Sequence, residues 1–288
     1  MPYSMRMISP WFSYLVKCTL ALTLLLTLNS AKLDLGITTS SDKSREVIVI
    51  HNTQIPRSDK EALIILPGFG DSKSGRKHQT RFFENVGYDL FIPDYVDRES
   101  FEGTVEKFHK FYVAQNLEQY DKVHVFSYIL GAWVINTFIN KYGAQNIGTI
   151  IYDRSPLQER APKVVEERLP RIGRMVAGKV LKDLSLVSYP SIAKNDVRVG
   201  ILVESKATPL IRRFKKTALS YGSIDWKNLD FNQDYDDLIY TRLNHDELYY
   251  SFEEIGPDIL HFLKKGTFTK DARREPFELG RASCRERW

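Results

Sequence analysis

The stretch KVHVFSYILGAWVINTF, from Lys122 to Phe138, decides the fold of this 288-residue chain. Its first half is an apolar run of strand length, and it predicts a buried strand over 122–129. Its second half predicts a helix over 131–142, which follows the strand with almost no linker. A buried strand that passes directly into a helix is typical of a parallel sheet covered by helices.

The same alternation of strand and helix extends in both directions from this stretch. Apolar runs predict six further strands, at 46–51, 61–68, 87–94, 148–153, 197–205 and 237–243. Between them, helices are expected at 78–85, 104–117, 210–220 and 247–264. The predicted fold class is therefore α/β, with a mostly parallel sheet covered by helices on both faces.

One interval, 155–195, breaks the alternation, because it lacks a strand and has a helical pattern. An apolar stripe recurs at helical spacing, formed by Val165, Leu169, Ile172, Val176, Val180 and Leu184. Most of the other side of the helical wheel is basic, with Arg168, Arg171, Arg174, Lys179 and Lys182. We expect a helical cap inserted after the fifth strand. It either packs as a lid on the core or rests on an anionic membrane.

Composition limits the domain organisation and the partners. One large domain over 45–266, cap included, fits the length. The two cysteines, Cys18 and Cys284, lie outside it, so disulfides and thiolate metal sites are excluded from the domain. The net charge of +5 comes without a cationic run interleaved with aromatic residues, which disfavours nucleic acid as a partner. Nucleotide-binding motifs and paired histidines are lacking, so we expect no cofactor and no metal. The sequence leaves the oligomeric state open.

The two ends of the chain have other signals. Arg6 and Lys17 precede an apolar run over 18–28, which predicts that residues 1–31 form a signal peptide for export to a secreted or periplasmic location. The alternative is an uncleaved membrane anchor that begins near Met7. Residues 267–288 are expected to form a tail. Within it, 278–288 (ELGRASCRERW) resemble a translated sequencing adapter and are left out of the fold prediction.

Three segments resemble the α/β-hydrolase superfamily, which contains serine esterases and lipases. They are LPGFGDS (66–72), YDLFIPDY (88–95) and the stretch from 122 to 138, and the resemblance covers roughly 46–266. It implies that the glycine-rich turn over 66–72 presents a backbone N–H, that of Phe69, toward a developing oxyanion. The oxyanion and binding residues implied in this way are Gly68, Phe69, Gly70 and Leu130.

The stretch from 122 to 138 resembles the nucleophile elbow, G-x-S-x-G, with one decisive difference. When Gly131 is aligned with the last glycine, Ser127 occupies the place of the first glycine and Ile129 the place of the serine. Isoleucine has no group that can be deprotonated or acylated, so the usual nucleophilic catalysis is impossible there. We also expect a relaxed turn, since β-branched Ile129 tolerates the strained elbow less well than serine. Ser127 is the one hydroxyl nearby.

The resemblance also implies a general base and an acid. His245, after the last strand and before the final helix, fits the base. Asp153 and Glu204, which follow the fifth and sixth strands, are both candidates for the acid. Two hypotheses follow. The first is a non-catalytic homologue that binds an apolar or acyl ligand, or a partner protein. The second is an active ester or lipid hydrolase that uses Ser127 or Ser72 with His245 and Asp153.

Overall fold

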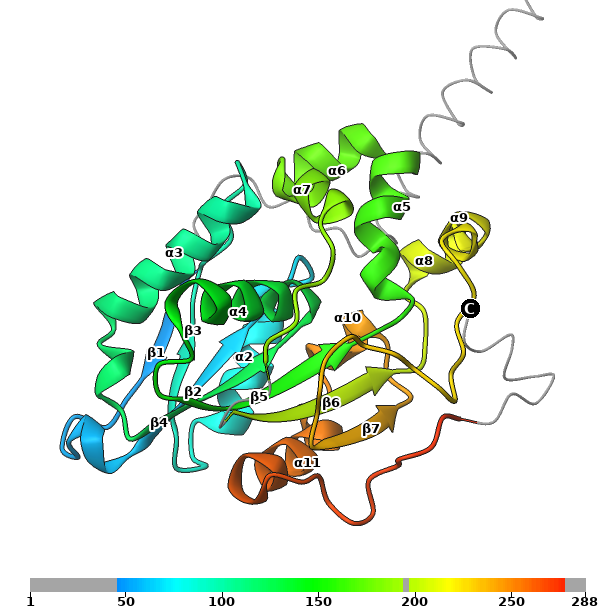
Figure 1. Ribbon diagram of the computed structural model, residues 1–288. Coiled ribbons are helices and arrows are strands. Elements are labelled where there is room, and N and C mark those ends of the chain that lie inside the picture. The colour runs from blue at the N-terminus through cyan, green and yellow to red at the C-terminus, as the bar shows by residue number, and fades with distance from the viewer. Residues whose placement is uncertain (1–45, 194–196, 278–288) are drawn as a thin grey trace, which may run out of the picture. The chain divides into compact units, whose positions relative to one another are not determined.

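The computed structural model describes residues 46–193 and 197–277, and its centre is a seven-stranded sheet. The strand order is β1-β3-β2-β4-β5-β6-β7, and every neighbouring pair is parallel except β1 and β3 (Figure 1). The strands are Ile48–Ile50, Glu61–Leu66, Asp89–Ile92, Lys122–Ser127, Ile147–Arg154, Arg198–Glu204 and Asp237–Thr241, from β1 to β7. All seven predicted strands are present, which confirms the α/β class.

Helices cover both faces of the sheet. The helices α3 (Phe101–Ala114) and α4 (Ile129–Tyr142) share one hydrophobic cluster with alternate residues of β2, such as Ile64. On the other face, α2 (Lys73–Phe83) and α11 (Phe252–Lys265) pack against Leu63 and Ile65. Since side chains alternate across a strand, each apolar strand contributes to both layers.

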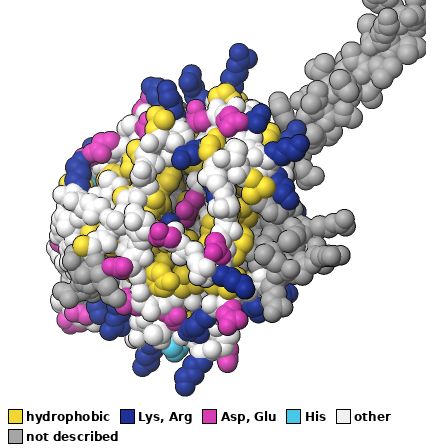
Figure 2. Space-filling model, turned by 45° about the vertical axis from the view of Figure 1, so that its right-hand side comes forward, with side chains coloured by type: hydrophobic (Ala, Val, Ile, Leu, Met, Phe, Trp, Pro, Cys, Tyr) yellow, Lys and Arg dark blue, Asp and Glu magenta, His cyan; other side chains and the backbone are white. Residues whose placement is uncertain are grey.

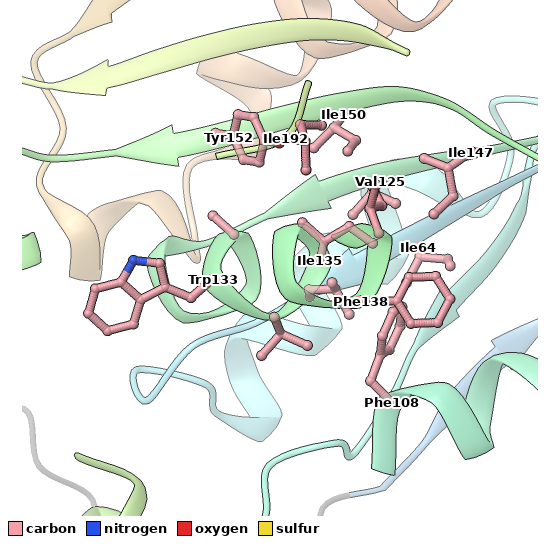
Figure 3. Close-up of a cluster of buried hydrophobic side chains, with 14 of the residues drawn as sticks. Ile64, Phe108, Val125, Trp133, Ile135, Phe138, Ile147, Ile150, Tyr152 and Ile192 are labelled. Atoms are coloured by element: carbon pink, nitrogen blue, oxygen red, sulfur yellow. The ribbon is translucent and has the colours of Figure 1, made fainter. Parts of the chain in front are cut away.

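The layer under α4 is the larger of the two clusters. Figure 3 shows Ile135 and Phe138 of α4 facing Val125 and Ile150 of the central strands, with Phe108 of α3 beside them. All five side chains are buried. This packing fixes where β4 ends and α4 begins, which is the position of the predicted elbow.

The insertion after β5 is helical, as predicted, but it consists of three short helices. These are α5 (Ala161–Arg168), α6 (Pro170–Ala177) and α7 (Val180–Leu186). Proline at the first position of α6 and Gly178 at φ +72° separate them. Gly178 also lies so close to the backbone of Arg98 that any side chain would clash.

The apolar stripe of the cap divides between two environments. Val180 and Leu184 are buried and belong to the core cluster, as the lid interpretation expects. The remaining four, Val165, Leu169, Ile172 and Val176, are only half-buried. The cap is therefore partly anchored in the core, and the outward side of α6 does not contribute to it.

Several boundaries differ from the sequence prediction. The strand expected over 122–129 ends at Ser127, so Ile129 belongs to α4, and the helices expected over 78–85 and 104–117 begin earlier, at Lys73 and Phe101. The helix expected over 210–220 is divided into α8 (Pro209–Arg213) and α9 (Lys215–Ser220), and the one over 247–264 is preceded by a separate short helix, α10 (His245–Leu248). The domain also extends past residue 266, because Phe268 is buried against Phe262, with ring centroids 4.7 Å apart.

The predictions for residues 1–31 and 278–288 lie outside the described residues. Within the described part of the chain, no helix has the length and apolar character needed to span a bilayer.

Candidate functional site

Three ionisable side chains meet at the carboxyl edge of the sheet. Asp153 lies near the end of β5, Glu204 is the last residue of β6, and His245 is the first residue of α10, after β7. Neighbouring parallel strands end at the same edge, so the topology brings the three together. The Nδ1 atom of His245 is 3.1 Å from Asp153 Oδ2 and 2.8 Å from Glu204 Oε1.

A local motif fixes the position of His245. The side chain of Asn244 accepts hydrogen bonds from the backbone N–H groups of Asp246 and Glu247, at 2.9 and 3.0 Å. In return, the Glu247 carboxylate accepts the N–H of Asn244 at 2.9 Å. This capping box begins α10 at His245, and the sequence NHDE is its signature.

The cluster has more acceptors than donors. Nδ1 of an imidazole carries one N–H, yet two carboxylates lie within hydrogen-bond distance of it. Both carboxylates are fully buried, and Asp153 Oδ1 and Glu204 Oε2 have no hydrogen-bond partner. Burial, together with the charge of Asp153, raises the pKa of Glu204 well above its ordinary value. We therefore infer that Glu204 retains a proton.

The charge state of His245 follows from the same neighbours. Burial lowers the pKa of the imidazole, but Glu204 and Asp153 outweigh that effect and raise the pKa well above its ordinary range. An imidazolium, one carboxylate and one protonated carboxyl group together carry no net charge. This neutral state avoids the large cost of an uncompensated buried charge.

The same three residues are the place where a metal ion could bind in the described part of the chain. Each offers one ligand atom, and these atoms lie within 4.8 Å of one another. The donor set of two carboxylates and one imidazole is compatible with a divalent cation. The imidazolium, however, already compensates the carboxylate charge, so the cluster does not require a metal.

The glycine-rich turn lies opposite His245. The position that a Cβ atom on Gly68 would occupy is 3.7 Å from His245 Nε2 and 3.7 Å from Leu130 Cβ. The hydroxyl of Tyr249 is still nearer, at 3.2 Å, and it accepts the backbone N–H of Gly68 at 2.8 Å. The predicted oxyanion residues Gly68 and Leu130 and the predicted base therefore converge on one point.

A buried tyrosine fills the space that the glycines leave. A Cβ atom on Gly70 would be 2.9 Å from the ring of Tyr249. That ring stacks on the ring of Tyr128, with centroids 3.9 Å apart and planes inclined by 5°. The resemblance had assigned the oxyanion donor to Phe69. That assignment stays a prediction, because the observed bond belongs to the preceding residue: the N–H of Gly68 donates to the Tyr249 hydroxyl, while the Phe69 side chain packs on the core cluster.

The elbow has the relaxed backbone that the sequence predicts. Tyr128, between β4 and α4, has φ −73° and ψ 169°, and none of residues 127–130 has a positive φ. Ile129 is the first residue of α4 and is 7% exposed. Gly131 lies against β2 so closely that a Cβ atom would be 2.4 Å from the carbonyl oxygen of Leu66. This contact supports the alignment that places isoleucine at the nucleophile position.

The structure does not bring the candidate serines to His245. Ser127 is fully buried in β4, and its hydroxyl is 3.4 Å from the carbonyl oxygen of Ile151 on the neighbouring strand. Ser72 caps α2 by accepting the N–H of Gly75 at 3.0 Å, and it also bonds the hydroxyl of Tyr250 at 2.9 Å. Both hydroxyls have structural roles.

Sequence reasoning did not identify Tyr128 or Tyr249. The ring of each meets the imidazole of His245 edge to face, at centroid distances of 5.8 and 5.6 Å. Tyr249 follows His245 by four residues, which is one helical turn, and this spacing was the available signal. The spacing alone cannot show that its hydroxyl reaches Gly68.

Comparison with solved structures finds similar chains at low sequence identity. A bromoperoxidase from Bacillus anthracis is 13% identical over 76% of this chain and 95% of its own, with a TM-score of 0.49. An α/β-hydrolase enzyme from a lagoon-sediment metagenome is 14% identical over 76% of this chain and 98% of its own, with a TM-score of 0.48. A bacterial membrane phospholipase A is 12% identical over 89% of this chain and 98% of its own, with a TM-score of 0.47.

No family model matches the sequence, and no curated protein matches it. The conclusion on fold therefore depends on the molecule itself. The mostly parallel sheet, its two helical layers and the strand–turn–helix around Ile129 give this chain the α/β-hydrolase fold.

Proposed function

We propose that this α/β-hydrolase-fold protein binds a small apolar or acyl ligand at the carboxyl edge of its sheet, without the acyl-enzyme chemistry of a serine hydrolase. One observation carries the proposal. An isoleucine stands where the fold needs a hydroxyl, and a tyrosine hydroxyl already accepts the N–H of Gly68 at 2.8 Å. An acyl oxygen that needs this donor would have to displace Tyr249.

The state of the base supports the same proposal. A general base must hold an unprotonated nitrogen near neutral pH. Burial lowers the pKa of His245, but the neighbouring acids Glu204 and Asp153 raise it well above its ordinary value, which favours the imidazolium. An imidazolium can orient a polar group of a ligand by donating a hydrogen bond from Nε2. It cannot accept a proton from a nucleophile.

The surface beneath the cap supports an apolar ligand. In the space-filling view, hydrophobic side chains gather in the middle of the face below the cap, around a hollow in which acidic side chains also appear (Figure 2). Binding sites for small molecules are mainly apolar, with a few polar groups that fix the orientation of the ligand. The mixture of side chains in this hollow is of that type.

Labelling with a fluorophosphonate probe tests the absence of catalysis. We expect no covalent label and no turnover of short-chain p-nitrophenyl esters by the full chain. The variant Ile129→Ser returns the hydroxyl, but it too should stay unlabelled because Tyr249 and the relaxed turn remain. Labelling of the wild-type protein would refute the proposal.

Titration with an environment-sensitive fluorescent fatty acid tests binding. Saturable binding is expected, and Ile129→Trp should weaken it at least about tenfold by filling space at the tip of the sheet. Ile55→Trp is the matched control, because Ile55 is exposed and lies in the segment that precedes the amino end of β2, whereas the site is at the carboxyl edge of the sheet. Equal effects of the two variants, or no saturable binding, would contradict the ligand-binding proposal.

An active hydrolase is the second candidate, and the position of His245 favours it. Its Nε2 atom is 3.7 Å from the Cβ position of Gly68, so the imidazole faces the glycine-rich turn as a general base would. In this case a fluorophosphonate would label the wild-type chain, and the label would disappear in Ser127→Ala or Ser72→Ala.

A further inference from the structure

The outer part of the cap contains a run of positive charge without a single acid. Residues 168–182 (RLPRIGRMVAGKVLK) include five cations and no Asp or Glu. All five side chains, Arg168, Arg171, Arg174, Lys179 and Lys182, are exposed. Among the apolar residues between them, Val180 and Leu181 are buried, so the core contacts of this run come from hydrocarbon side chains and not from the cations.

A second cationic segment lies beside the first. Arg212, Arg213, Lys215 and Lys216, from the end of α8 and the start of α9, are also exposed. Arg168 joins the two segments, because its Nε donates to the hydroxyl of Thr217 at 2.6 Å. We call these nine cations the basic surface. The whole chain has a net charge of +5, so the rest of it carries a net charge of −4.

Neighbouring acids neutralise only part of this surface. Lys179 pairs with Glu99 at 2.7 Å and Arg168 with Glu167 at 3.0 Å, and all four side chains are largely exposed. Exposed pairs of this kind are weak and are easily exchanged for other partners. No carboxylate of the described residues lies within ion-pair distance of Arg171 or Arg174.

Apolar side chains stand among these cations. On α6, Gly173 and Ala177 are buried, while Arg171, Arg174 and the 60% exposed Met175 share the outward side. Together with Pro170 they line a shallow depression of about 370 Å³. On α9, the 41% exposed Leu219 follows Lys215 and Lys216 by one turn. Each helix thus presents two cations and one flexible apolar side chain.

We infer that the basic surface docks this protein on an anionic lipid membrane. Guanidinium groups pair with lipid phosphates, while methionine and leucine side chains enter the boundary between headgroups and acyl chains. In Figure 1 the cap, α8 and α9 lie beyond the carboxyl edge of the sheet, and in Figure 2 Lys and Arg side chains project around the top of the molecule. The inference goes beyond ligand binding and holds for either candidate function.

Vesicle binding by the full chain tests the inference. Affinity is measured for vesicles of pure phosphatidylcholine and for vesicles with about 30 mol% phosphatidylserine, which gives them a negative surface. The variant Arg171→Gln/Arg174→Gln/Lys216→Gln should weaken binding to the anionic vesicles about 100-fold, since each cation near such a surface contributes about fivefold. The matched control Lys264→Gln/Lys265→Gln/Lys270→Gln removes the same charge from exposed sites around the end of α11 and should change binding less than about threefold.

A second readout separates the basic surface from the N-terminal segment, which could hold the chain on any bilayer. The fluorescence of Met175→Trp, with the parent spectrum subtracted, should shift to the blue on anionic vesicles only. Val113→Trp, also at an exposed position, should not shift. Equal loss in the two triple variants, or no shift for Met175→Trp, would overturn the inference. So would a loss confined to binding of duplex DNA, which would assign the surface to nucleic acid.

Discussion

The two halves of the candidate site differ in how closely they match the arrangement that the resemblance to serine hydrolases implies. On the side of the base, one imidazole meets two buried carboxylates at 2.8 and 3.1 Å, which is one acid more than a triad needs. On the side of the nucleophile, the hydroxyl is replaced by Ile129, and Tyr249 accepts the N–H of Gly68. The base side has one more acidic group than a catalytic triad has. On the nucleophile side, the side chain of Ile129 and the hydroxyl of Tyr249 occupy the places of a nucleophile and of a ligand oxygen.

Under the proposed function, this difference means that charge pairing keeps the base side in place for structural reasons. Buried charges must stay paired, so removing Asp153 or His245 leaves the other with an uncompensated charge. An exposed or half-buried nucleophile is under no such constraint. The base side is therefore tied to folding, and the nucleophile side is free to change. Variants of the two sides test this separation.

The largest effect is expected for His245→Ala. It leaves two buried carboxyl groups without a cation, and we expect it to destabilise the fold by about 3–5 kcal/mol in urea unfolding. The matched control is His124→Ala, since His124 is also buried and lies 3.1 Å from Glu61. The side chain of Glu61 is 35% exposed and can be rehydrated, so His124→Ala should lower the free energy of unfolding much less than His245→Ala. Equal losses of unfolding free energy in the two variants would contradict the claim that His245 compensates buried charge.

A pH effect of intermediate size is expected for Glu204→Gln. The folded state raises the pKa of both Glu204 and His245, so their protonated forms stabilise the fold and that stability is lost as the pH rises. As the pH rises from 6 to 9, the stability of the wild-type protein should fall more steeply than that of the variant, which has one fewer titrating group. Unfolding measured across this range gives the answer.

The control for the pH experiment is Glu118→Gln, because Glu118 is exposed and distant from the cluster. It should have the same pH dependence as the wild-type protein. A Glu204→Gln variant whose stability follows the wild-type curve would mean that Glu204 is ionised throughout, and the proton assignment would fail.

A smaller effect is expected for Tyr249→Phe. Loss of the hydroxyl removes one hydrogen bond and leaves the N–H of Gly68 without its partner, at a cost of about 1–2 kcal/mol. The freed N–H should also strengthen binding of a carboxylate or acyl ligand. Tyr128→Phe, which loses bonds to Gln79 and the Leu248 carbonyl at 3.0 and 3.3 Å, should be destabilised without that gain. Calorimetry with a short fatty acid distinguishes the two.

The smallest effect is expected for Ser127→Ala. Its hydrogen bond is long, at 3.4 Å, and the serine occupies space within the sheet that alanine can also fill. We expect a change in unfolding free energy of less than about 1 kcal/mol, with no change in ligand binding. A large loss of ligand binding or of fluorophosphonate labelling would give Ser127 a role in the site. The nucleophile side would then contribute to function together with the base side.

The sequence alone was enough for the strands and the helical cap. Apolar runs of strand length and the turn before Gly131 are local features. The capping box that starts α10 at His245 is local too, but the sequence analysis did not recognise it and expected the helix from residue 247. The order of strands then places Asp153, Glu204 and His245 at one edge. Where local pattern was weaker the prediction failed, as at the division of the cap at Gly178 and the extension of the domain through Phe268.

Only the tertiary structure decided how the side chains at that edge meet. Gly68 and Tyr249 are 181 residues apart in the sequence, and no periodicity predicts that one donates a hydrogen bond to the other. The shared contact of both carboxylates with one imidazole nitrogen, and the burial of Ser127 within the sheet, are also results of packing. Local patterns determine which element a residue joins and which edge it reaches. Contacts between distant segments depend on how the layers pack together, because the dense interior leaves each side chain few positions.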